Sequence, residues 1–164
     1  RRLIAPNSLP VRPTTDRAKE ALFNILENRY FFDTKTVLDL FSGTGNIAYE
    51  FASRGCEKIT AIDNNAKCIQ YIEKTSNELG FNIRAIKSDC LQYLNTSKRQ
   101  FNFIFADPPY SYEHYHKLKD SIINNKLIAK DGCLIIEHDK DTIFEDENVE
   151  LRNYGTVQFS IFSF

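Results

Sequence analysis

The segment Asp107-Pro108-Pro109-Tyr110 closes a short apolar run, residues 101–106, and it carries the most specific chemistry of the chain. An apolar run that stops at two prolines is typical of a buried strand in a parallel sheet, and ligands bind at the carboxyl edge of such sheets. The stop brings together a carboxylate, a backbone carbonyl and an aromatic ring. The two oxygens can accept both hydrogens of an exocyclic amine while the ring stacks on the planar base that carries it. We therefore predict that Asp107, Pro108, Pro109 and Tyr110 form a catalytic site.

Three further carboxylates, Asp39, Asp63 and Asp89, stand at or just beyond the ends of predicted strands. We expect Asp39 to face a cationic amine, Asp63 to accept hydrogen bonds from a ribose diol, and Asp89 to hold an amino group such as that of adenine. S-adenosylmethionine carries all of these groups, together with a positive sulfonium. Each carboxylate has an alternative role as the cap of a following helix or turn. The joint arrangement with Asp107 favours the cofactor.

A glycine turn, Phe41-Ser42-Gly43-Thr44-Gly45, joins the first strand to the next helix. Glycines let the backbone approach a ligand closely, and the helix amides then point at it. A dinucleotide fingerprint has its third glycine where this chain has Ala48, and alanine is tolerated there, so the glycine pattern alone leaves a pyrophosphate open. The predicted cofactor-binding residues are Asp39, Phe41, Ser42, Gly43, Thr44, Gly45, Asp63, Asn64, Asp89, Cys90 and Asp107.

The elements that position these residues alternate between strand-like and helix-like segments, which predicts a parallel sheet with helices on both faces. Two last strands are joined by Tyr154-Gly155-Thr156, a hairpin signal. We therefore predict an α/β, Rossmann-like fold whose mostly parallel, seven-stranded sheet ends in an antiparallel β-hairpin. The predicted strands are 36–41, 58–62, 82–87, 101–106, 133–137, 149–153 and 157–162, and the predicted helices are 45–53, 66–79 and 112–124, with one or two helical turns at 91–94.

A further helix is predicted before the first strand, because apolar residues between positions 18 and 26 fall on one helical face and Pro13-Thr14-Thr15-Asp16 provides a stop and a cap. Residues 1–20 carry a net charge of +3 and the rest of the chain −4. A basic leading arm fits a nucleic-acid contact confined to one region, and a solvated N-terminal face is the alternative.

The length and composition of the chain restrict the class of protein to which it can belong. The length of 164 residues, with 42% hydrophobic and 26% charged residues, predicts one globular domain: a basic arm and helix over 1–30 and a core over 36–164. No apolar segment is long enough to cross a bilayer. The four cysteines and three histidines show neither CxxC pairing nor zinc-like spacing. We expect a cytoplasmic monomer with buried thiols, no metal and no membrane partner.

The set Asp39, Gly43-Thr44-Gly45, Asp63, Asp89 and Asp107–Tyr110 resembles the class I S-adenosylmethionine-dependent methyltransferases that act on amino nitrogens of bases. Residues 12–26 are similar to the opening helix of the RsmD-type methyltransferases, which modify a guanine N2 in small-subunit ribosomal RNA. Residues 38–45, followed by 53–55, match that family too, and the resemblance runs from residue 3 onward.

This resemblance implies the class I methyltransferase fold, S-adenosylmethionine as cofactor, and small-subunit ribosomal RNA or the assembling small ribosomal subunit as partner. The RNA contacts are expected at Arg12, Thr15, Arg17 and Lys19. The target base must be unpaired or flipped for its amine to be reached. We also consider Phe23, Tyr112, His114 and His116 for the lining of the base pocket; core packing for Phe23 and an exposed helix face for the two histidines are the favoured alternatives.

Four alternatives are considered at this point. Protein-glutamine methyltransferases normally have Asn where this chain has Asp107, which counts against them. A DNA amino-methyltransferase needs a target-recognition insertion, for which this chain has no room. A nucleotide-binding module that keeps the fold without catalysis does not need Asp107–Tyr110 intact. A nicotinamide-dependent dehydrogenase leaves the same segment without a role.

Overall fold

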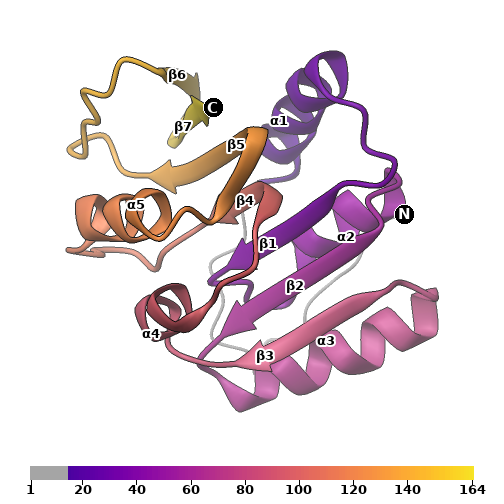
Figure 1. The fold of residues 1–164 in the computed structure, drawn as a ribbon. Coiled ribbons are helices and arrows are strands. Elements are labelled where there is room, and N and C mark those ends of the chain that lie inside the picture. Colours follow the sequence, from indigo (N-terminus) through magenta and orange to yellow (C-terminus); the bar gives the residue numbers. More distant parts are fainter. Residues whose placement is uncertain (1–14) are drawn as a thin grey trace.

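The computed structural model describes residues 15–164, so Arg12 and most of the predicted basic arm lie outside the described residues. The elements follow one another as shown in Figure 1. They are α1 (Asp16–Arg29), β1 (Thr36–Leu40), α2 (Asn46–Ser53), β2 (Lys58–Asp63), α3 (Ala66–Leu79), β3 (Ile83–Lys87), α4 (Cys90–Thr96), β4 (Phe101–Ala106), α5 (Tyr115–Asn124), β5 (Ile128–His138), β6 (Val149–Tyr154) and β7 (Val157–Ser163).

The strands form one seven-stranded sheet in the order β3-β2-β1-β4-β5-β7-β6. The first five strands are parallel, and β7 lies antiparallel to both β5 and β6. The predicted Rossmann-like α/β fold with a C-terminal hairpin is therefore confirmed. The strand order changes direction at β1, which has β2 on one side and β4 on the other. Such a switch point opens a crevice at the carboxyl ends of the strands, where ligands bind in open α/β sheets.

Two apolar layers cover the sheet, one on each face. The helices α1 and α2 pack on one face, where Phe23 contacts Phe51 and Phe51 contacts Phe103 of β4. The helices α4 and α5 pack on the other face, where Leu118 lies in the same buried cluster as Ile104 of β4. Successive side chains of a strand point to opposite faces, so neighbours in β4 fill different cores. This double burial explains why β4 is a continuous apolar run.

The helix α1 begins at the position that the sequence predicted from its cap. The side chain of Thr15 accepts a hydrogen bond from the backbone N–H of Ala18 at 3.3 Å, and the helix then buries Leu22, Phe23 and Leu26. Phe23 therefore belongs to the core and not to a base pocket. All four cysteines are buried and free, as predicted.

The strand β5 starts earlier than predicted, at Ile128 and not at Cys133. Its pairing with β4 shifts register between Phe101 and Phe103, so the polar residues before Gly132 belong to an irregular strand. Gly132 permits this, because an added Cβ would lie 2.8 Å from the carbonyl oxygen of Asn102. Sequence periodicity does not reveal such a bulge, because charged residues beside a glycine have the composition of a turn.

Residues 139–148 form no helix, which agrees with the sequence pattern. None of the helices within residues 15–164 is long and apolar enough to span a membrane. In the same part of the chain, no three side chains of the metal-binding types gather into a group.

Candidate active site

The glycine turn between β1 and α2 has a fixed left-handed backbone. Phe41, Gly43 and Gly45 all have positive φ angles, of 54°, 56° and 88°. The hydroxyl and the backbone N–H of Ser42 both donate to the carbonyl oxygen of Ile62, at 3.1 and 2.9 Å, which ties the turn to β2. The surroundings of position 45 also favour glycine, because a Cβ there would lie 2.8 Å from the ring carbon Cζ of Tyr49.

Asp63 at the end of β2 holds the same turn in place. Its Oδ2 accepts a hydrogen bond from the N–H of Gly43 and its Oδ1 from the N–H of Asn65, both at 2.9 Å. Each carboxylate oxygen has a second lone pair for a further donor. The structure thus gives Asp63 a backbone-organising role that the ribose prediction did not include. The neighbouring Asn64 is exposed.

Asp39 is the most unusual carboxylate of the site. Its side chain is 1% exposed, and its Oδ2 atom has no hydrogen-bond partner among residues 15–164. Burial, and then the charge of Asp63, raise its pKa well above the ordinary value for aspartate, and the N–H of Ala48 counteracts this only in part. A buried carboxylate with an unsatisfied oxygen costs free energy unless a donor or cation reaches it. A hydrogen-bond donor or a cation that reaches this oxygen would remove that cost.

Asp89 adopts the capping role that the sequence left open. Its Oδ2 accepts a hydrogen bond from the N–H of Gln92 at 3.0 Å, which makes it the N-cap of α4. The side chain is otherwise exposed at the carboxyl edge, beyond β3. Cys90, the first residue of α4, is buried, and its burial raises the pKa of the thiol to about 12. This thiol therefore packs against its surroundings and is not a nucleophile.

The segment after β4 lies beside the glycine turn. Leu40 of β1 pairs with Ala106 of β4, and the N–H of Asp107 points at the carbonyl oxygen of Leu40 at 3.5 Å. Asp107 is half-buried and Pro108 buried, whereas the side chain of Tyr110 is 80% exposed. The helix α5 begins at Tyr115, later than predicted, because the chain first turns back after the prolines.

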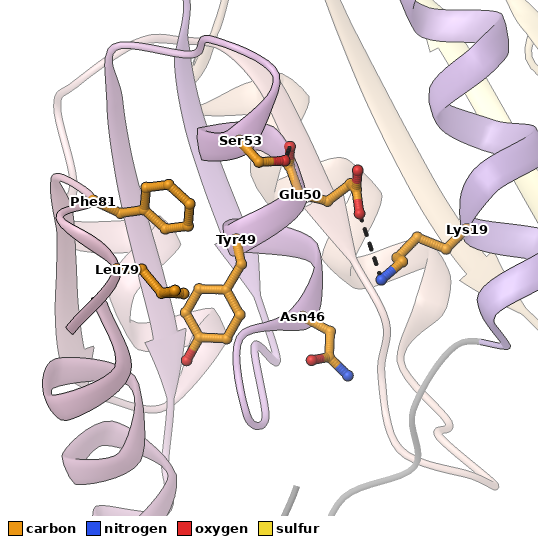
Figure 2. Close-up of a pocket in the computed structure, with 7 residues that line it drawn as sticks. All are labelled: Lys19, Asn46, Tyr49, Glu50, Ser53, Leu79 and Phe81. Atoms are coloured by element: carbon orange, nitrogen blue, oxygen red, sulfur yellow. Dashed lines mark hydrogen bonds and ion pairs between the residues drawn. The ribbon is translucent and has the colours of Figure 1, made fainter. Parts of the chain in front are cut away.

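The residues predicted to contact RNA differ in the contacts that they already make within the protein. Arg12 lies outside the described residues, and Thr15 is the cap of α1. Arg17 is exposed, whereas Lys19 forms an ion pair with Glu50 of α2 at 3.5 Å, as Figure 2 shows. Part of the charge of Lys19 is therefore already neutralised.

The groove in Figure 2 crosses the outward face of α2 and has a volume of about 100 Å³. It is lined by Lys19, Asn46, Tyr49, Glu50, Ser53, Leu79 and Phe81. Tyr49 connects this groove to the glycine turn, because its ring lies directly behind Gly45.

Sequence reasoning missed the role of Tyr49 and did not identify the neighbours of Tyr112. The spacing of four residues between Gly45 and Tyr49 is a helical signal for a contact, although it does not say which way the ring points. The sequence suggested Tyr112 for the base pocket. The structure packs its ring against Phe41, and the pKa of Tyr112 is raised first by burial and then by Cys90 and Asp89.

Comparisons with known proteins agree with this geometry. Residues 1–163 match the protein family described as "Conserved hypothetical protein 95". The chain is 34% identical over 146 residues to "Putative rRNA methyltransferase YlbH" of Bacillus subtilis (strain 168), covering 86% of this chain and 78% of that protein. It is 30% identical over 138 residues to "Ribosomal RNA small subunit methyltransferase D" of Escherichia coli (strain K12), covering 84% of this chain and 69% of that protein.

Among solved structures, a hypothetical protein of Thermus thermophilus has the same fold, with a TM-score of 0.87 and 24% identity over 99% of this chain and 93% of that one. The match to the family over nearly the whole chain is decisive. This chain belongs to the Conserved hypothetical protein 95 family, that of the RsmD- and YlbH-like rRNA methyltransferases, which are class I S-adenosylmethionine-dependent methyltransferases.

Proposed function

We propose that this protein transfers a methyl group from S-adenosylmethionine to the exocyclic N2 amine of a guanine in small-subunit ribosomal RNA. The observation that carries the proposal is the register between β1 and β4. Because Leu40 pairs with Ala106, the glycine turn and Asp107 leave the sheet side by side at its switch point. A cofactor held by the turn and an amine held by Asp107 would then be neighbours.

The residues at the turn fit this cofactor. The amino group of its methionine part is a cation, and it would satisfy the buried Oδ2 of Asp39. A cation there would also relieve the repulsion between Asp39 and Asp63. The left-handed glycines leave the backbone bare for a close approach. Asp63 and Asp89 complete the proposed site at the ribose and adenine ends, and each retains capacity to accept a further hydrogen bond beyond the backbone N–H groups that it already binds.

The chain's chemical task is to make a weak nucleophile reactive. The lone pair of an aryl amine is delocalised into the ring, so the nitrogen is flat and poorly nucleophilic. We propose that Asp107 and the carbonyl oxygen of Pro108 accept the two amine hydrogens and so favour a pyramidal nitrogen, while Tyr110 stacks on the base. Stacking of this kind contributes about 1–3 kcal/mol per base. Holding the two reactants in line supplies much of the acceleration.

When bound, S-adenosylmethionine supplies the methyl group on a positively charged sulfur, which leaves with the bonding electron pair. The methylated amine must then lose one proton, which Asp107 accepts or passes to water. The half-buried position of Asp107 suits both acceptor roles.

The choice of substrate rests on the relatives and on charge. The Escherichia coli protein named above and its counterpart in Buchnera aphidicola, 30% identical over 142 residues, are both named as small-subunit ribosomal RNA methyltransferases. We propose the same substrate class here, with phosphate contacts at Arg12 and Arg17 and weaker ones at Thr15 and Lys19, because Lys19 is already paired with Glu50.

The test is transfer of a tritiated methyl group into small ribosomal subunits, and separately into their naked RNA, from a strain that lacks this modification. We expect label on the N2 of a guanine, with Asp107→Ala as the inactive control. Label on an adenine or cytosine amine would contradict the guanine assignment. Failure to label either RNA substrate, with a protein that binds the cofactor, would contradict the RNA assignment.

A further inference from the structure

The chain turns sharply between Pro109 and Tyr112. The N–H of Tyr112 donates to the carbonyl oxygen of Pro109 at 3.1 Å, and Ser111 at the third position of the turn has a φ of 64°. A positive φ at this position is the signature of a type II turn. The turn separates two tyrosines: the side chain of Tyr110 is exposed, and that of Tyr112 is half-buried.

Tyr112 packs against the residue that follows β1. Its ring meets the ring of Phe41 edge-on, with centroids 5.3 Å apart and an interplanar angle of 71°. Tyr115 holds it from the other side at 5.3 Å. The pKa of Tyr112 is raised to about 12, first by burial and then by the proximity of Cys90 and Asp89. Its ring therefore lies against Phe41, which follows β1, and close enough to Asp89 and Cys90, which follow β3, for them to affect its pKa.

Phe41 is itself fixed at this junction. It has a left-handed backbone, with a φ of 54°, and its N–H lies within hydrogen-bonding range of the Cys90 thiol, whose pKa it lowers in part. Backbone strain in a bulky residue persists only where the surroundings hold it, and it concentrates at ligand sites. Phe41 and Tyr112 thus form an aromatic corner beside the exposed cap of α4.

We propose that Tyr112 is a cofactor-contacting residue: its ring, braced by Phe41, covers the adenine end of the S-adenosylmethionine site. This inference rests on the proposed function, which assigns Asp89 and Cys90 to the adenine. An aromatic face beside a hydrogen-bond acceptor is a suitable platform for a purine. Asp107 and Tyr110 belong to the same segment, residues 107–112, so one short segment would contact both the cofactor and the target base.

The experiment compares two ligands that share adenosine but differ in the amino-acid part: S-adenosylhomocysteine and 5′-methylthioadenosine. Calorimetry would measure their affinities for the wild type and for Tyr112→Ala, Tyr112→Phe and Asp39→Asn. We expect Tyr112→Ala to weaken both ligands by the same factor, about tenfold. Tyr112→Phe should stay within about twofold of the wild type, because it keeps the ring. Asp39→Asn should weaken S-adenosylhomocysteine alone.

Tyr154→Ala is the matched control for loss of packing. Tyr154 is another half-buried tyrosine, packed on Phe159 at 6.0 Å, but it lies in the hairpin at the far end of the sheet. We expect it to leave both affinities unchanged. Circular dichroism would establish that each variant is folded at the temperature of the binding measurement.

A folded Tyr112→Ala protein that binds both ligands as the wild type does would overturn the inference. So would a loss confined to S-adenosylhomocysteine, which would place the ring at the amino-acid end. If the wild type itself binds neither ligand, the proposed function fails first, and the two failures are thereby distinguished.

Discussion

The two halves of the site are built in different ways. In the cofactor half, the turn from Phe41 to Gly45 is tied to β2 through the hydrogen bonds of Ser42 and Gly43, and each of these bonds measures 3.1 Å or less. In the amine half, the chain after Asp107 turns outward and exposes 80% of the Tyr110 side chain. The first half presents a fixed surface to a ligand of constant shape. The second half presents an aromatic ring that can adjust to a base delivered by a large RNA. We infer that affinity for the cofactor is preorganised, whereas capture of the base requires side-chain movement.

The largest effect is expected in the cofactor half, from Gly45→Ala. The left-handed backbone costs an alanine about 1–2 kcal/mol, and the collision of its Cβ with Tyr49 adds about 1–3 kcal/mol. Urea unfolding would measure the total loss. Gly80→Ala is the matched control, because Gly80 has a φ of 71° and open space around it. An equal loss of unfolding free energy in both variants would show that Tyr49 is not the reason for glycine at position 45. Tyr49→Leu should recover part of the loss from Gly45→Ala only.

An intermediate effect is expected in the amine half, from Tyr110→Ala. Loss of base stacking should raise the KM for RNA about tenfold, since stacking contributes about 1–3 kcal/mol per base. Stability should change by less than about 0.5 kcal/mol, because the side chain is exposed. Steady-state kinetics with ribosomal subunits would measure KM. Phe31→Ala is the control, because this aromatic side chain is 79% exposed and lies between α1 and β1. An unchanged KM in Tyr110→Ala, or a weakened cofactor, would contradict the division into halves.

The smallest effect is expected for the pH dependence of stability, through His138, which packs on Tyr115 next to the amine half. His138 is buried at the end of β5, between Tyr115 and Phe144. Its Nδ1 lies 2.7 Å from the carbonyl oxygen of Asp139, which can only accept, so Nδ1 carries the proton and Nε2 accepts from the hydroxyl of Ser160, also at 2.7 Å. Burial lowers the pKa of His138 below its ordinary value of 6.5.

The unfolded chain therefore binds a proton at a higher pH than the folded one, and stability should fall as the pH drops below about 6.5, by at most about 1.4 kcal/mol per pH unit. Urea unfolding at about pH 7.5 and about pH 5.5 would measure the difference. We expect His138→Gln to flatten this dependence and His114→Gln, at an exposed position, to preserve it. The same slope in the wild type and in His138→Gln would contradict the assignment.

Local patterns in the sequence were sufficient for the fold class and for several ends of elements. The apolar run of β4, the cap at Thr15 and the hairpin at Gly155 each depend on a few adjacent residues, and the structure contains all three. The site was harder to predict, because its contacts join distant segments. Nothing local to Asp63 indicates that its carboxylate binds the N–H of Gly43. Likewise, no periodicity places Tyr112 against Phe41, because a tight turn with a left-handed Ser111 brings them together.

The central claim is that the two halves divide the work: Asp39 binds the cofactor, and Asp107 accelerates transfer. The most direct test is the single-turnover rate of Asp107→Ala at saturating cofactor, measured together with its affinity for S-adenosylhomocysteine. We predict that the rate falls about 10²-fold, as for the loss of one preorganised electrostatic group, while the affinity stays within about twofold of the wild type. Loss of cofactor affinity together with a wild-type rate in the bound fraction would contradict the account.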